Sequence, residues 1–152
     1  ERPEASVDIR VDAYIPDSYI SDNDMKIDIY KRIRDADSLE AVDGLRSELN
    51  DRFGKIPGEV EALLEVQGLR VVCERSGVAR IGLSGGSIEA EFAAGHEPGP
   101  ATIRSALDAS EMPLHFDATS GLVLRFEAPA GRREALRQGR KVLKRFIPSA
   151  NL

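Results

Sequence analysis

The stretch VARIGLSGGSIEAEFA, residues 78–93, decides the fold class of this chain. Two runs with the composition of β-strands stand on either side of Gly85-Gly86. A glycine pair can adopt the positive φ angles that a tight hairpin turn requires. We therefore predict strands at Val78–Ser84 and Ser87–Ala93, joined by this turn.

Downstream of this hairpin the chain returns to helix and then to strand. The Gly/Pro-rich residues 95–100 lead into a short helix that contains Ile103 and Leu107. A second hairpin is predicted from Leu114–Ala118 and Leu122–Glu127, with its turn at Ser120-Gly121. The apolar residues Leu136, Leu143 and Phe146 mark a last helix, which Pro148 ends.

Upstream of the hairpin, one strand and three helices are predicted. Apolar residues alternate with polar ones from Val7 to Ile15, the pattern of a strand with one buried face, and Pro16 ends it. Asp22 is the expected N-cap of a helix whose apolar positions recur every four residues. The break at residues 35–37 separates this helix from the next.

The second and third helices have their own start and stop signals. Asp37 followed by Glu40 indicates a variant of the capping box, and the helix has an apolar stripe from Leu39 to Phe53. Gly54 is expected to end it in a left-handed conformation. Pro57 suits the first turn of a third helix, which runs to Gly77.

This order of elements predicts an α+β fold. The sheet is mostly antiparallel, is built from the N-terminal strand and two hairpins, and has about five helices packed against it. We expect a single domain over residues 1–152, with a helical first half (1–77) and a hairpin-and-helix second half (78–152).

Composition excludes several classes of protein. The chain is 41% hydrophobic and 31% charged, which is typical of a globular protein, and its formal net charge is −5. No apolar run approaches the ~20 residues of a membrane span, and the acidic start does not resemble a signal peptide. Cys73 is the only cysteine and is expected to be buried. A cytoplasmic location is expected.

Motifs of catalysis are missing from the sequence. It contains no phosphate-binding P-loop, no dinucleotide fingerprint, no H-E-x-x-H and no G-x-S-x-G. We therefore expect a non-catalytic domain with no cofactor and no metal of its own.

Three polar residues share the end of the second helix. Glu48 and Arg52 are four residues apart and can form an ion pair, and Asp51 lies beside them, clear of the apolar stripe. An acidic residue near a helix C-terminus opposes the helix dipole, which a partner's arginine would relieve. An ordinary surface salt bridge and a catalytic carboxylate pair remain open alternatives.

A second candidate surface is the basic last helix. Seven cationic residues face one acid, Glu134, and they are Arg132, Arg133, Arg137, Arg140, Lys141, Lys144 and Arg145. Such a strip can lie along phosphates, so Arg137, Arg140, Lys141 and Lys144 are candidate contacts to nucleic acid or a partner. A solvated helix face is the alternative.

Three motifs support a family resemblance. Residues 14–22 read YIPDSYISD, residues 30–33 read YKRI, and residues 48–57 read ELNDRFGKIP. In this order they resemble the C-terminal domain of the bacterial transcription-repair coupling factor. The resemblance covers about the first half of the chain and is loose beyond Gly77.

The resemblance implies a function for the parent protein and for this domain. The parent is an ATP-driven DNA translocase, with ATP and Mg²⁺ in its motor, that displaces stalled RNA polymerase and recruits the repair protein UvrA. Its C-terminal domain packs on an N-terminal UvrB-like module, masks the UvrA-binding surface and restrains the motor. Carried over by motif, Glu48, Asp51 and Arg52 lie on that clamp. The isolated domain is expected to be a monomer.

Overall fold

The computed structural model describes residues 4–148, and it divides the chain into two compact units. The helical unit comprises residues 11–71. The sheet unit comprises residues 1–10 and 72–152. The expected halves meet at residue 77, whereas in this division residues 1–10 and 72–77 are grouped with the sheet.

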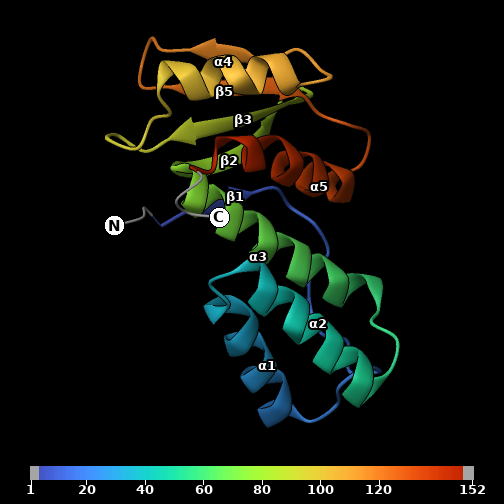
Figure 1. Cartoon of the computed structure of the whole chain (residues 1–152). Coiled ribbons are helices and arrows are strands. Elements are labelled where there is room, and N and C mark those ends of the chain that lie inside the picture. Colours follow the sequence, from blue (N-terminus) through green and yellow to red (C-terminus); the bar gives the residue numbers. More distant parts are fainter. Residues whose placement is uncertain (1–3, 149–152) are drawn as a thin grey trace. The chain divides into compact units, whose positions relative to one another are not determined.

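The described residues form five strands, five α-helices and one 3₁₀ turn (Figure 1). In chain order they are β1 (Ser6–Asp8), α1 (Asn23–Asp35), α2 (Leu39–Phe53), α3 (Gly58–Ser76), β2 (Val78–Ser84), β3 (Ser87–Phe92), α4 (Pro100–Ala109), β4 (His115–Asp117), β5 (Val123–Glu127), α5 (Arg132–Leu143) and η1 (Lys144–Phe146). The predicted α+β class is confirmed.

The sheet has the order β1-β2-β3-β5-β4. Both predicted hairpins are present: β2 pairs antiparallel with β3, and β4 pairs antiparallel with β5. Gly85 and Gly86 have φ angles of 54° and 85°, as the two-residue turn requires. Only β1 pairs in parallel, with β2, so the sheet is mostly antiparallel as predicted.

One face of the sheet forms the core of its unit. Ile81, Ile88, Ala90, Leu124 and Phe126 alternate along the strands and are buried. The ring of Phe146 in η1 packs edge to face on Phe92 and Phe116, with centroids 5.8 and 6.0 Å away. The turn after α5 therefore closes this core. Cys73, near the end of α3, is buried, as predicted.

Charged side chains cross between strands elsewhere on the sheet. The Arg80 guanidinium on β2 donates to Asp8 on β1 at 2.6 Å and to Glu91 on β3 at 2.7 Å. Arg125 on β5 pairs with Glu89 on β3. A Cβ added to Gly82 would lie 2.8 Å from an Arg80 nitrogen, so this glycine makes room for the guanidinium.

The helical unit has an apolar core between α1, α2 and α3. Ile29, Val42, Leu49, Val60 and Leu64 are among its fully buried members. The predicted cap of α1 is confirmed, since the backbone N–H of Met25 donates to Asp22 at 3.0 Å. Gln67 on α3 is buried too, and its amide donates to the Ala36 carbonyl at 2.8 Å.

The predicted strand from Val7 to Ile15 is wrong in length. Burial alternates through the whole segment, but the ladder with β2 ends at Asp8. Beyond that point the backbone N–H of Tyr14 donates to the Glu59 carbonyl and that of Ile15 donates to the Tyr30 hydroxyl. An alternating pattern predicts burial, whereas a strand also needs a neighbouring strand to pair with.

The predicted capping box at the start of α2 is also wrong. The N-cap is Ser38, whose hydroxyl accepts from the Ala41 N–H at 3.0 Å. Pro57 precedes α3 instead of lying in its first turn, and its carbonyl accepts from Val60 and Glu61. In both cases the element exists as predicted and its boundary moves by one residue.

Two further details of the helices differ from expectation. Leu107 on α4 is 42% exposed, and Ala106 is the buried residue of that helix. Gly54 ends α2 with φ 87° and ψ −168°, a conformation that is essentially restricted to glycine but lies outside the left-handed helical region.

Substitution of Gly77 tests how tightly the sheet unit is packed. Its φ is 85°, and an added Cβ would lie 2.3 Å from the His96 carbonyl oxygen. Gly77→Ala should therefore lower the free energy of unfolding by about 3 kcal/mol, from backbone strain plus a clash. Gly95→Ala is the matched control, with φ 83° and open space around the added Cβ. It should cost only about 1 to 2 kcal/mol in chemical denaturation, and equal losses would contradict the clash.

Candidate docking site

The C-terminal end of α2 presents the three residues predicted to dock. Leu45 and Leu49 on the same helix point into the core of the helical unit, and Phe53 is half-buried. Asp51 and Arg52 are exposed, while Glu48 is 33% exposed at its side chain. The apolar stripe of the helix thus fixes which side chains face outward.

Glu48 is already engaged within the helical unit. Its two carboxylate oxygens accept from both terminal nitrogens of Arg32 on α1, each at 2.7 Å. One of these oxygens also accepts from Arg52 at 2.8 Å. Both the predicted pair with Arg52 and a second pair across helices are therefore present.

These two arginines stabilise the ionised form of Glu48. Hydrogen bonds from Arg32 and then from Arg52 lower the pKa of Glu48 from 4.5 to about 2. The side chain is therefore a carboxylate at any pH at which the domain is expected to work. Ionisation of Glu48 near neutral pH disfavours it as the general acid of a catalytic carboxylate pair, which needs one protonated member.

Arg32 is absent from the sequence-based site. It lies 16 residues before Glu48, and only the packing of α1 against α2 brings the two together. One signal for it was present in the sequence, since Arg32 belongs to the YKRI motif of residues 30–33 that supports the family resemblance. Arg52 has further contacts, because its guanidinium lies 4.9 Å from the centroid of the Phe53 ring and 3.2 Å from the Met25 sulfur.

Tyr19 connects two of the motifs that carry the family resemblance. Its hydroxyl lies 3.0 Å from the Leu49 carbonyl oxygen and 2.9 Å from that of Gly54. Its ring meets that of Phe53 edge to face, with centroids 5.8 Å apart. Tyr19 therefore anchors the last turn of α2, and the residue that follows it, to the segment before α1.

Asp51 differs from its two neighbours. Its side chain is exposed at the end of α2 and makes no hydrogen bond or ion pair among residues 4–148. Its charge opposes the helix dipole there, as the sequence predicts. Of the three predicted residues, Asp51 is therefore the one whose charge is not compensated within the described chain.

A groove lies beside Glu48 in the helical unit. It has a volume of about 540 Å³ and is lined by side chains of α1, of α2 and of the connection between them. Glu48 and Arg32 lie on its rim, whereas Asp51 is not part of its lining. The carboxylates of Glu48 and Asp51 thus do not share this groove, which again disfavours a catalytic pair.

The basic strip predicted for the last helix lies on α5 and η1 in the sheet unit. Arg137, Lys141 and Lys144 are exposed and Arg140 is half-buried, opposite the buried residues Leu136, Val142 and Leu143. Arg137 forms an ion pair with Glu134. Cations near a helix C-terminus also stabilise the helix, so the strip has a structural role as well.

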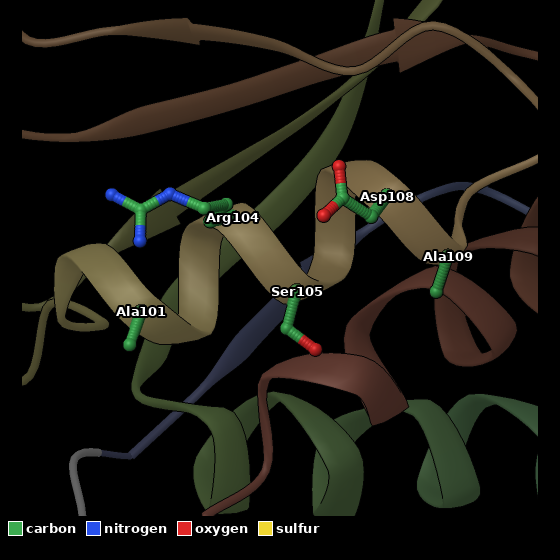
Figure 2. Close-up of a pocket in the computed structure, with 5 residues that line it drawn as sticks. All are labelled: Ala101, Arg104, Ser105, Asp108 and Ala109. Carbon is green, nitrogen blue, oxygen red and sulfur yellow. The ribbon is translucent and has the colours of Figure 1, made fainter.

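Neither of two hollows in the described part of the sheet unit is lined by the predicted docking residues Glu48, Asp51 and Arg52. Figure 2 shows the one on α4, where Arg104 and Asp108 project from one side and Ala101, Ser105 and Ala109 from the other. A larger pocket of about 760 Å³ includes His96 and Thr102 at the start of α4. Within residues 4–148 no cluster of His, Cys, Asp and Glu has the makings of a metal site. No helix in this range combines the length and apolar character of a membrane span.

Comparison with known proteins agrees with this arrangement. A model of the TRCF domain family matches residues 9–103, which include the whole helical unit, the β2–β3 hairpin and the first four residues of α4. The chain belongs to the TRCF domain family. The match contains Tyr19, Arg32, Glu48, Asp51 and Arg52, so the docking candidates lie inside the region that defines the family.

Curated relatives of this TRCF domain are transcription-repair-coupling factors. The protein from Bacillus subtilis is 42% identical over 81 residues, and that from Haemophilus influenzae is 42% identical over 88 residues. These matches cover 53% and 57% of this chain and 7% and 8% of the relatives. The chain thus spans a small part of the length of these proteins.

A solved structure extends the likeness to nearly the whole TRCF domain. It is a crystal structure of the C-terminal domain of a transcription-repair coupling factor, with a TM-score of 0.82 and 27% identity. The match covers 96% of this chain and 95% of the other. The sheet unit, for which the sequence resemblance was loose, therefore shares the fold too.

The Glu48 bridge predicts a specific dependence of stability on acid. Because its pKa falls to about 2 in the folded state, the stabilisation is complete above the unfolded value of 4.5 and is lost as the pH falls through about 2. Glu48→Gln should remove this component, so the variant and the wild type should converge in melting temperature between pH 4.5 and 2. Glu40→Gln, an exposed residue at the start of the same helix, is the control. A constant gap at all pH values would contradict the bridge.

Proposed function

We propose that this domain is a non-catalytic docking module of a transcription-repair coupling factor. The observation that supports it best is the exposed Asp51 carboxylate, uncompensated within the described residues, beside the fixed Arg32–Glu48–Arg52 bridge. An uncompensated carboxylate on a rigid helix end can accept charge-assisted hydrogen bonds from a partner. The family membership supplies the partner class.

The geometry suits a contact that must hold and then release. Glu48 and Arg52 are held by intradomain bonds, so they present a pre-ordered polar surface that loses little side-chain entropy on docking. Asp51 adds the charge that a basic partner would neutralise, with relief of its unfavourable position at the helix end. A few polar contacts of this kind give a modest affinity that another ligand can overcome.

In the parent protein this surface is proposed to meet the N-terminal UvrB-like module. Docking would mask the UvrA-binding surface and restrain the ATP-driven motor, and engagement of RNA polymerase would release it. ATP and Mg²⁺ belong to the motor in this proposal, and the docking domain needs no cofactor. We call this releasable contact the latch. In it Glu48, Asp51 and Arg52 bind the partner module, and the domain itself carries out no chemical reaction.

Asp51→Ala in the full-length parent tests the latch. Loss of a contact worth about 2 kcal/mol would shift the closed population more than tenfold, so UvrA binding and ATP turnover should both rise. Asp51 is the most informative position to substitute, because loss of its carboxylate breaks no hydrogen bond or ion pair within the described residues. Glu48→Ala combined with Asp51→Ala should act in the same direction, with added loss of stability.

The matched control for Asp51→Ala is Asp43→Ala. It removes an exposed carboxylate from the same helix, one that pairs with Arg46 and lies about two turns before Asp51. UvrA binding and ATP turnover should stay at wild-type values in this control. If they stay there in Asp51→Ala as well, the latch assignment fails.

Nucleic-acid binding by the basic strip is a second candidate function. Arg137, Lys141 and Lys144 recur at helical spacing on an exposed face, which is the observation in its favour. Contacts to phosphates would release counterions, so affinity for DNA would fall steeply with salt.

A salt titration tests this second function. The chain should bind duplex DNA at low salt, and neutralising Arg137, Arg140 and Lys144 to Ala should flatten the slope of log K against log salt by about 3. Ser105→Ala, on the exposed face of α4, serves as a neutral control. Absence of binding at low salt would rule the function out.

A further inference from the structure

A glycine in the middle of α2, Gly44, lines the groove beside Glu48. Gly44 is exposed in the helix interior, and a Cβ added there would meet nothing within 4 Å. Glycine within a helix is less favourable than alanine, and here no neighbour in the described chain requires it. A side chain at this position would project into the groove that Gly44 lines.

The lining of the groove combines an apolar floor with a charged rim. Ala36 and Leu45 are buried and Ala41 is half-buried, and these three supply the floor. The rim carries Arg32, Asp35, Asp37 and Glu48. Arg32 and Glu48 bind each other and Asp37 has an interaction of its own within the described chain, so Asp35 is the rim carboxylate open to exchange.

Asp35 is an accessible carboxylate of this rim. Its side chain is 70% exposed, and its neighbour Arg34, at 3.3 Å, is 66% exposed. Ion pairs between such exposed groups are weak and exchange readily with other partners. A cationic side chain entering the groove can therefore replace Arg34 at little cost.

The charge of the helical unit favours a basic occupant. Residues 11–71 contain fourteen Asp and Glu against eight Lys and Arg, whereas the net charge of the whole chain is −5. The excess of acid is thus concentrated in this unit. A long cationic side chain would lay its methylene stem on the apolar floor and place its charged end at the acidic rim.

We infer that the groove at Gly44 receives an arginine or lysine side chain from the surface on which the domain docks. The inference rests on the proposed docking function and adds a second contact. This contact lies about two helical turns before Asp51 along α2. Asp51 supplies a polar contact at the helix end, and the groove supplies a shaped pocket that fixes the register of the partner.

Filling the groove tests this inference. The 152-residue chain is titrated with the separately expressed N-terminal module of the same coupling factor, by calorimetry. Gly44→Leu should weaken binding by about tenfold or more, because the leucine occupies the groove. Gly44→Ala should bind nearly as the wild type does and unfold at a higher temperature, since alanine favours the helix and leaves most of the groove open.

Two further variants guard against indirect effects. Asp43→Leu adds the same side chain to an exposed position of α2 outside the groove lining, about two turns before Asp51, and should leave binding unchanged. Asp35→Lys leaves the floor intact, reverses one rim charge and should weaken binding by about fivefold or more at low salt.

The outcomes separate the groove from the docking proposal itself. If Asp51→Ala weakens binding while Gly44→Leu and Asp35→Lys bind like the wild type, the groove assignment is overturned and docking stands. If the wild-type chain does not bind the module at all, docking fails, and the groove assignment fails with it.

Discussion

The carboxylate of Glu48 accepts hydrogen bonds from two arginines on two helices. This bridge fixes the positions of polar side chains on the outer surface of the helical unit. Arg32 ties α1 to α2, while Arg52 holds the last turn of α2. Because both guanidinium groups bind Glu48, neither neutralises Asp51, and Asp35 remains exposed at the rim of the groove at Gly44. The bridge is half exposed, so its contribution to stability is modest and its main effect is to fix side-chain positions.

The residues that carry the family resemblance divide into structural and functional sets. Leu49 is buried, Phe53 packs on Tyr19, and the Tyr19 hydroxyl binds the carbonyls at the end of α2. Gly54 adopts a backbone conformation that other residues avoid. These positions explain why the two motifs occur together, since each supports the other in space. Asp51 has no such role within the described residues, and this distinguishes it as the docking candidate.

Local signals predicted most of the elements, and long-range contacts decided the rest. The hairpin at Gly85-Gly86 and the cap at Asp22 depend on neighbours a few residues away, so the sequence was sufficient for both. Ser38 replaces Asp37 as a cap because cap choice depends on backbone angles that composition does not reveal. The predicted strand does not continue beyond Asp8, because the fold decides whether a neighbouring strand is available for pairing. Arg32 could not be assigned to the site, because 16 residues separate it from Glu48 and only helix packing joins them.

The central claim is that Asp51 makes a direct, charge-dependent contact with the N-terminal module of the coupling factor. The most direct measurement is a titration of that module with the wild-type chain and with Asp51→Asn, which keeps the shape of the side chain and removes its charge. We predict that the wild type binds and that Asp51→Asn binds at least about tenfold more weakly, with a smaller dependence on salt. Equal affinity and equal salt dependence for the two chains would contradict the claim.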